Sequence, residues 1–154
     1  MFLKRIGTLF KKKSKYAQDY SNPYGIQSNP YMDEYYSGME EIESMWSVMY
    51  NLKIVYGEKA DIFEQKCFQN INAFNHLSPD FTNTIKYVPA YIRLTMLYEK
   101  QERYDEAITV CAEAIKRGYV SDNSKGGMYG RLSRLIRKSG KPADADILKL
   151  IQQK

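Results

Sequence analysis

The sequence predicts an all-α protein made of antiparallel helical hairpins, and three observations support this prediction. Apolar residues recur at helical spacing from Met39 onward, turn-forming residues interrupt this pattern at intervals, and two stretches of the C-terminal half repeat each other's pattern. The chain has 154 residues, of which 44% are hydrophobic, so it is long enough to bury the core of a single domain.

The composition argues against several classes of protein. The longest apolar runs are only a few residues, which excludes a transmembrane helix. One histidine, His76, and two cysteines, Cys67 and Cys111, provide neither a disulfide framework nor a metal cluster. Both cysteines fall on apolar helix faces, where we expect buried, unreactive thiols. We therefore expect a protein that is not an enzyme, with no metal, no cofactor and no catalytic residues, in a reducing cytoplasmic setting.

The net charge of +5 conceals an acidic middle between two basic ends. Residues 1–15 carry a net charge of +6, residues 16–124 a net charge of −7, and residues 125–154 a net charge of +6. A nucleic-acid-binding protein usually presents one continuous basic surface, so this distribution argues against nucleic acid as a partner.

Residues 1–15 predict a basic amphipathic N-terminal helix. Lysines and an arginine surround a single apolar stripe, and the segment lacks the long apolar region and the cleavage site of a secretory signal. The stripe consists of Phe2, Leu3, Ile6, Leu9 and Phe10. The segment suits three roles: reversible adsorption to an anionic membrane surface, a cap on an open edge of the helical domain, or a disordered tail.

Residues 16–38 predict a linker rich in Tyr, Asn and Pro. Ser-Asn-Pro-Tyr occurs twice, at Ser21–Tyr24 and at Ser28–Tyr31, and each proline favours extended geometry in the residue before it. We expect either a plain solvated linker or a recognised peptide motif in the repeated Asn-Pro-Tyr.

Residues 39–77 predict the first hairpin of a helical domain that extends over residues 39–154. Its first helix ends at Gly57, and its second ends at the turn of residues 78–80. The two apolar stripes consist of Ile42, Met45, Trp46, Met49, Leu52 and Val55, and of Ile62, Phe63, Cys67, Phe68, Ile71 and Phe74.

Residues 88–121 place large and small residues at regular positions of two further helices. These positions are Tyr91, Leu94, Tyr98, Tyr104, Ala107, Cys111 and Ala114. A small residue at Ala107 lets two helices approach closely, and Leu94 and Tyr98 fill the groove beside it. This pattern resembles one tetratricopeptide repeat, a helix–turn–helix unit of about 34 residues. Glu102 stands where that repeat usually has a glycine.

A weaker copy of the pattern follows at residues 126–153. Its matching positions are Tyr129, Leu132, Ile136, Gly140 and Ala145. The resemblance implies a short tetratricopeptide-like array, an α–α superhelix in which the hairpin of residues 39–77 is a third unit, because about three units are needed for a stable core. The last helix, residues 143–153, has apolar residues with no following unit. We expect the N-terminal helix, a second copy of the chain or another partner to cover this edge.

The resemblance also implies a binding groove, because the first helices of tetratricopeptide repeats line a concave face that holds a peptide. The groove positions are Ile92, Arg93, Met96, Glu99 and Lys100 in the clear repeat, and Gly130, Arg131, Arg134, Arg137 and Lys138 in the weaker one. Arg131, Arg134 and Lys138 share one helix face. Because an arginine binds carboxylates bidentately, we expect a partner protein or peptide of acidic character. The alternative is a solvated face paired with the acidic middle of the chain.

Two glycines, Gly126 and Gly127, precede the helix that carries these arginines. They predict either exposed backbone N–H groups that hold an anion or a flexible, tightly packed helix entry. Taken together, the sequence predicts a non-enzymatic protein-interaction module. The alternative is a peripheral membrane or anionic-surface adaptor anchored by residues 2–13.

Overall fold

The computed structural model describes residues 29–153, which are helical throughout apart from their connections. The predicted amphipathic helix of residues 2–13 and most of the predicted linker lie outside the described residues. In the described part there are seven helices and no strand: α2 (Pro30–Asn51), α3 (Glu58–Asn75), α4 (Pro79–Thr82), α5 (Pro89–Lys100), α6 (Tyr104–Lys116), α7 (Gly127–Ser139) and α8 (Ala145–Gln152). The prediction of an all-α protein is confirmed for this part of the chain.

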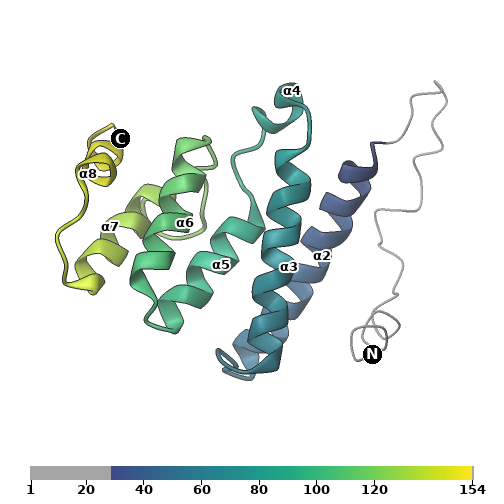
Figure 1. The fold of residues 1–154 in the computed structure, drawn as a ribbon, viewed down its shortest axis with the longest axis horizontal. Helices are drawn as coiled ribbons and strands as arrows, with labels where there is room; N and C mark the ends of the chain where they lie inside the picture. Colours follow the sequence, from purple (N-terminus) through teal and green to yellow (C-terminus); the bar gives the residue numbers. More distant parts are fainter. Residues whose placement is uncertain (1–28, 154) are drawn as a thin grey trace.

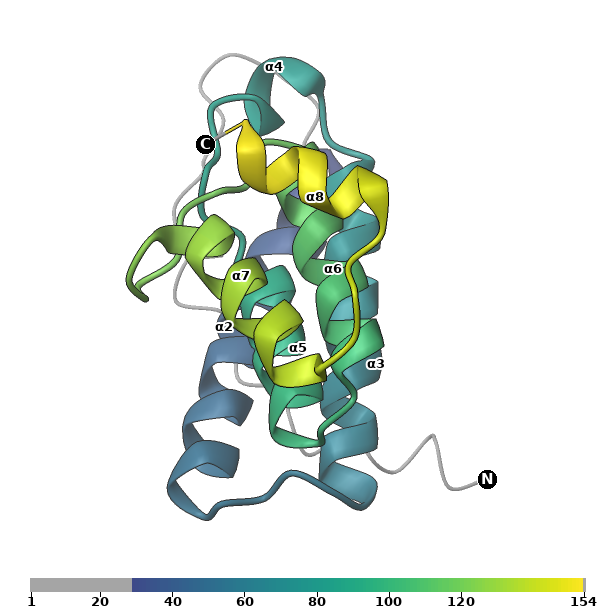
Figure 2. The same cartoon turned by 90° about the vertical axis from the view of Figure 1, so that its left-hand side faces the viewer.

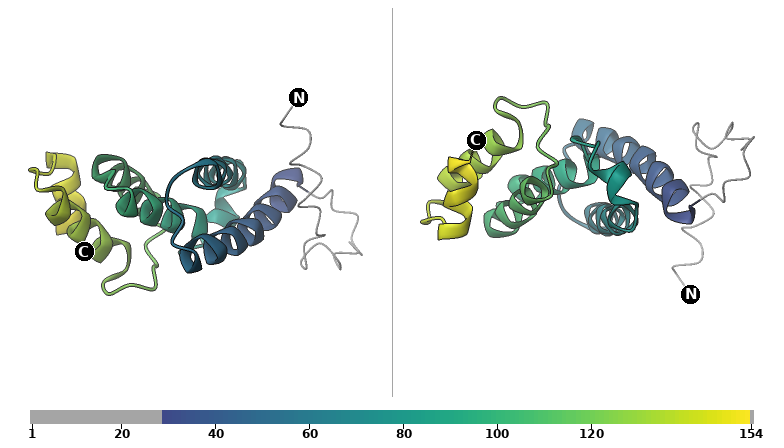
Figure 3. Two further views of the ribbon diagram at one scale, coloured as in Figure 1. Left: turned by 90° about the horizontal axis from the view of Figure 1, so that it is seen from below. Right: turned by 90° about the horizontal axis from the view of Figure 1, so that it is seen from above.

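The helices pack in antiparallel pairs that follow one another along the molecule. α2 lies against α3 and α5 lies against α6, and α6 in turn packs against α7. Figure 2 shows α2, α5 and α7 on one side of the molecule and α3 and α6 on the other. The views from below and above in Figure 3 show the same succession of pairs. We call the side formed by the first helices of each pair the α2–α5–α7 face.

α2 begins at Pro30, so the predicted linker boundary at residue 38 is wrong. Asn29 has extended backbone geometry, and its side chain accepts a hydrogen bond of 3.0 Å from the N–H of Tyr31. This is an N-cap followed by a proline in the first turn, where the missing proline N–H costs nothing. The Asn-Pro step that predicted extended chain therefore starts a helix, and Tyr35 in this helix is buried in the core.

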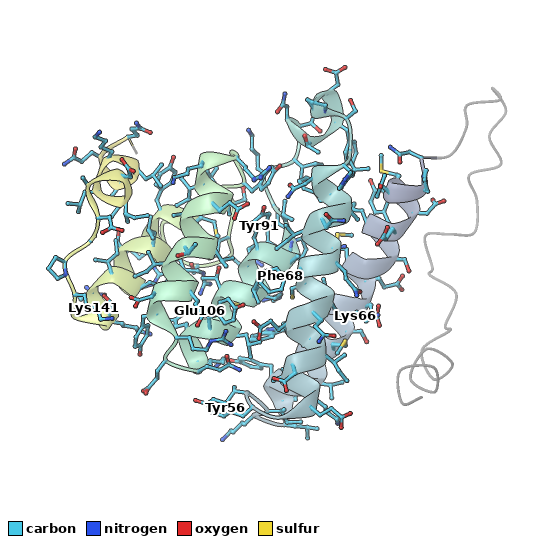
Figure 4. All side chains as sticks on the ribbon, viewed as in Figure 1. Tyr56, Lys66, Phe68, Tyr91, Glu106 and Lys141 are labelled. Carbon is cyan, nitrogen blue, oxygen red and sulfur yellow. The ribbon has the colours of Figure 1, made fainter. Side chains whose placement is uncertain are left out.

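The core between α2 and α3 is aromatic. Ile42, Trp46 and Met49 of α2 are buried as predicted, and they face the buried residues Phe63, Cys67 and Phe74 of α3. Burying large apolar side chains of this kind contributes about 1.5–3 kcal/mol for each one. Two members of the predicted stripes are exposed instead: Leu52 is 62% exposed and Phe68 is 49% exposed. Figure 4 shows Phe68 on the side of the molecule that is opposite to the α2–α5–α7 face.

The packing of α5 against α6 follows the predicted large and small positions. Tyr91, Leu94 and Tyr98 are at most 2% exposed, and Ala107 and Cys111 are fully buried. Glu102 in the connecting turn has a φ of 58°, in the left-handed region that favours glycine, which is the usual residue here in the repeat that this segment resembles. A small side chain at the crossing point of the two helices allows their close approach.

α8 differs from the expected second helix of a regular hairpin. It begins at Ala145 rather than at residue 143, and it has no buried residue. Figures 1 and 2 show α8 lying across the direction of the other helices, near the ends of α6 and α7. Ile147 and Ile151 are half-buried and Leu148 is 45% exposed, because an eight-residue helix at this angle covers only part of α7. Among residues 29–153, no helix is both long enough and apolar enough to cross a bilayer.

Gly38 leaves room on α2 for a side chain of α3. A Cβ atom at this position would lie 2.7 Å from the side-chain nitrogen of Asn70. That side chain is buried on α3 and donates a hydrogen bond of 2.8 Å to the carbonyl oxygen of Tyr35 on α2. The amide of Asn70 therefore has no room to move without breaking its bond to α2.

We predict that Gly38→Ala destabilises the protein. Alanine in a helix interior normally gains about 1 kcal/mol over glycine, but overpacking against Asn70 costs about 1–3 kcal/mol. Urea unfolding followed by circular dichroism measures the net change. Ser37→Ala, at the exposed neighbouring position, is the matched control and should leave stability unchanged or slightly increased. An increase in stability for Gly38→Ala would show that α2 and α3 are less tightly packed than described.

Candidate functional site

The structure brings the predicted groove residues of α5 and α7 to one face, but few of them are both exposed and without a partner in the described part of the chain, as binding a ligand would require. Ile92 is 2% exposed and belongs to the core, so its predicted role as a groove residue is wrong. Met96 is half-buried and Lys100 is exposed at the surface of α5. The cationic groups Arg93, Arg131 and Lys138 already contact carboxylates of the chain itself.

Arg131 lies at the centre of a buried group of charges. Its Nε atom lies 2.5 Å from Oδ2 of Asp122, and its Nη1 atom lies 3.3 Å from Oε2 of Glu99. The side chains of Arg131 and Asp122 are only 10% and 3% exposed. The expectation that Arg131 binds an acidic partner is therefore wrong, because its guanidinium group is enclosed by internal carboxylates. This result matches the alternative interpretation, in which the basic face pairs with the acidic middle of the chain.

Asp122 is held in its charged form by this arrangement. Burial acts to raise the pKa of the carboxyl group, but the hydrogen bond and charge of Arg131 act in the opposite direction, as do two hydrogen bonds from Ser124. The balance leaves the pKa of Asp122 below its ordinary value. A buried carboxylate with these partners is a structural group, since removal of its cation would leave an uncompensated charge.

The connection between α6 and α7, residues 117–126, is hydrogen-bonded to α7. Arg134 donates hydrogen bonds of 2.8 Å to the carbonyl oxygen of Lys125 and 2.7 Å to the hydroxyl of Ser124. Gly130 makes this contact possible, because a Cβ atom there would lie 2.2 Å from the carbonyl oxygen of Lys125. Arg134 therefore positions the connection, and its charge is met by neutral oxygens rather than by a carboxylate.

The glycines at the start of α7 do not form an anion site. The N–H of Gly127 donates to the carbonyl oxygen of Ser124, and the N–H of Met128 donates to that of Val120. The N–H of Gly130 completes the first turn by donating to the carbonyl oxygen of Gly126. Since backbone oxygens satisfy these donors, the structure favours the tightly packed helix entry over the anion site.

An open hollow lies between α2 and α5, at the other end of the same face. Its volume is about 410 Å³, and its walls are Glu43, Trp46, Ser47, Tyr50, Asn51, Arg93 and Met96. We call it the α2–α5 hollow. Arg93 donates two hydrogen bonds of 2.9 Å to the carboxylate of Glu43, and its guanidinium carbon lies 5.8 Å from the centre of the Trp46 ring. These contacts set one wall of the hollow in place.

At Tyr50, the α2–α5 hollow is bordered by an aromatic ring with a cation against it. The Nζ atom of Lys100 lies 5.2 Å from the centre of the Tyr50 ring, and Tyr50 is 57% exposed. Within residues 29–153, Lys100 has no ion pair. The rim can therefore offer an aromatic surface and a positive charge to the same ligand.

Sequence reasoning missed the part of the hollow that α2 provides. Glu43, Ser47 and Tyr50 recur at helical spacing along one flank of the predicted apolar stripe. That signal was present in the sequence, but the spacing does not tell which flank of a helix faces the next hairpin. The contacts of Arg93 with Glu43 and of Lys100 with Tyr50 decide this.

Other side chains that could take part in chemistry or binding lie away from this face. Cys67 and Cys111 are fully buried, as predicted, and burial raises the pKa of both thiols, that of Cys111 to about 12. His76 is the C-cap of α3, where its ring stacks on Tyr31. A smaller hollow of about 170 Å³ with charged walls lies beside Glu106 and Lys141, which Figure 4 labels. In the described part of the chain, no three His, Cys, Asp or Glu side chains are grouped to hold a metal ion.

Comparison of the chain with protein-family models, with curated proteins and with solved structures finds no match in any of the three. The fold therefore defines the protein at the level of its class: residues 29–153 are all-helical, with helices packed in antiparallel pairs.

We predict that Arg131→Met strongly destabilises the protein. The substitution leaves Asp122 buried without its cation, and breaking a buried ion pair in this way costs about 3–5 kcal/mol. The free energy of unfolding in urea measures the loss. The double variant Asp122→Asn/Arg131→Met removes both charges and should recover part of it. Equal stabilities for Arg131→Met and wild type would contradict the structural role of this group.

The depressed pKa of Asp122 predicts a pH dependence of stability. Its charged form contributes stability at any pH above the ordinary pKa of an unfolded aspartate, and this contribution is lost as the pH falls through the lower pKa of the folded state. Wild type should therefore be more stable than Asp122→Asn at pH 7, and the difference should shrink as the pH falls below about 4. Urea titrations of both proteins at a series of pH values measure this difference. A constant difference across the series would show that Asp122 is not held charged by folding.

Proposed function

We propose that the chain is a non-catalytic protein-interaction module whose α2–α5–α7 face binds a segment of another protein. The single observation that carries this proposal is the α2–α5 hollow, which is lined by Trp46, Tyr50 and Met96, with the cation of Lys100 against the Tyr50 ring. Aromatic and sulfur-containing side chains in an open depression provide a large apolar contact at low entropic cost. A nearby charge gives the contact its specificity.

The proposal includes a tetratricopeptide-like stacking of the hairpins. In support, the residues of the clear repeat that should be large or small at the helix crossing are buried, and the first helices of successive pairs lie on the same side. In a stack of this kind the first helices form a concave binding face. The crosswise position of α8 is a departure from a regular array and limits the face to the region from α2 to α7.

The ligand of this proposal is an acidic segment with an apolar or aromatic residue. Cations on or beside the α2–α5–α7 face that have no carboxylate partner within residues 29–153 include Lys100, Arg134 and the exposed Arg137. The apolar residue of the ligand would occupy the hollow, and its acidic residues would extend toward α7. This proposal keeps the predicted acidic partner but assigns its recognition to Lys100 rather than to Arg131.

A selection from a displayed library of random peptides against the immobilised full chain tests this proposal. We expect the enriched peptides to combine an aromatic or large aliphatic residue with Asp or Glu. The variant Tyr50→Ser/Lys100→Glu should bind the resynthesised peptides at least about tenfold more weakly, because it removes the aromatic anchor and reverses the charge beside it. Dissociation constants from fluorescence anisotropy measure the change.

Phe68→Ser is the matched control for this experiment. Phe68 is an aromatic residue of similar exposure to Tyr50, but it lies on the opposite side of the molecule. Its replacement should leave peptide affinity within about twofold of wild type, as for a residue outside the interface. Peptides that bind wild type and the Tyr50→Ser/Lys100→Glu variant equally well would exclude the hollow as the site.

A further inference from the structure

We propose that the N-terminal half of α2 is a docking surface for residues 2–13 of the same chain. The surface consists of Met32, Asp33, Tyr36, Met39 and Glu40, and we call it the α2 patch. Met32, Tyr36 and Met39 are only partly buried against the core, and Asp33 is exposed. The patch adjoins the α2–α5 hollow without including any of its residues, so the proposal does not depend on what the hollow binds.

The helical repeat places the apolar residues of the α2 patch on the α2–α5–α7 face. Met39 precedes Glu43, which lines the hollow, by four residues, and Tyr36 precedes it by seven. Asp33 and Glu40 are seven residues apart and flank this apolar stripe on its solvent side. The patch is therefore a partly open apolar strip with carboxylates along its edge.

α2 is an acidic helix. The helix carries five acids, at positions 33, 34, 40, 41 and 43, and no base. Glu41 pairs with Lys66 and Glu43 pairs with Arg93. Asp33, Glu34 and Glu40 have no ion pair within residues 29–153. This end of the molecule therefore keeps a negative charge that the described residues leave uncompensated.

Residues 2–13 are complementary to the α2 patch in both charge and pattern. Their apolar stripe of Phe, Leu and Ile is surrounded by five of the six bases of residues 1–15, with no acid. The partly open edge at α7 and α8 is a poorer site, because residues 125–154 carry a net charge of +6, of which Glu99, Asp122 and Asp105 compensate only a part, so that it would repel this segment. Opposite charges around two apolar strips instead favour the α2 patch.

The connection is long enough for docking within one chain. Fifteen residues, 14–28, separate the segment from Asn29 at the start of α2. Fully extended, they span about 50 Å, whereas the 22 residues of α2 extend over only about 33 Å. Residues 2–13 can therefore reach any part of α2, and the tether raises their local concentration at the patch.

A spin label on residues 2–13 of the full chain tests this proposal. Thr8→Cys places the label opposite the apolar stripe, and labelling is selective because Cys67 and Cys111 are fully buried. Paramagnetic broadening of backbone amide signals in NMR spectra reports which residues lie near the label. We expect strong broadening at residues 32–43 and none in α7. Broadening concentrated in α7 or α8, or spread evenly over the surface, would overturn the proposal.

Charge-reversal variants show whether the contact is the proposed one. Lys11→Glu/Lys12→Glu/Lys13→Glu should abolish the broadening, Asp33→Lys/Glu40→Lys should also abolish it, and the combination should restore it. Asp61→Lys/Glu102→Lys, which changes two exposed acids outside the α2 patch, is the matched control and should leave it unchanged. Failure of the combined variant to restore the broadening would count against docking on the α2 patch. Loss of broadening when labelled chain is diluted with unlabelled chain would show docking between two copies and would overturn docking in one chain.

Discussion

The buried ion pairs of Arg131 fix α7 against α5 and so hold one half of the α2–α5–α7 face in place. One guanidinium group joins Glu99 of α5, Asp122 of the connection and its own helix α7. Charges in such a place are costly to bury unless each is paired and hydrogen-bonded. The connection is consequently drawn against α7, where Arg134 and the absence of a side chain at Gly130 hold it. At the end of the face near α7, carboxylates of the chain itself therefore occupy the basic groups that a ligand would need.

This pairing gives the two ends of the face different properties. Near α7, carboxylates of the chain neutralise two of the basic side chains, and backbone oxygens satisfy the first N–H groups of the helix. Near α2, the side chains are aromatic and sulfur-containing, and the rim residues Tyr50 and Lys100 stay in contact with solvent. Opposite charge also separates the two ends, since α2 carries only acids and α7 only bases. The proposed binding functions follow from this polarity.

Much of the helical framework could be predicted from spacing alone. The burial of Ile42, Trp46 and Met49, of Tyr91, Leu94 and Tyr98, and of Ala107 follows from apolar residues at helical period and from one small residue at a crossing. The helix boundaries were harder to predict from the sequence. Asn29-Pro30 starts α2 although the same pair also favours an extended linker, and only the cap hydrogen bond distinguishes the two outcomes. The angle of α8 was not predictable, because α8 packs against both α6 and α7, and contacts between helices distant in sequence set it.

The sequence by itself determined that the part of the chain from Met39 onward is helical, that its cysteines are buried and that the charges of the chain are divided between acidic and basic segments. These properties depend on local spacing and composition. Only the tertiary structure decided which charges meet. The three bases Arg131, Arg134 and Lys138 share a helix face in the sequence, yet each has a different environment: buried carboxylates, neutral oxygens, and a half-exposed ion pair. The reason is physical, because the partner of a charge is set by packing between helices that are distant in sequence.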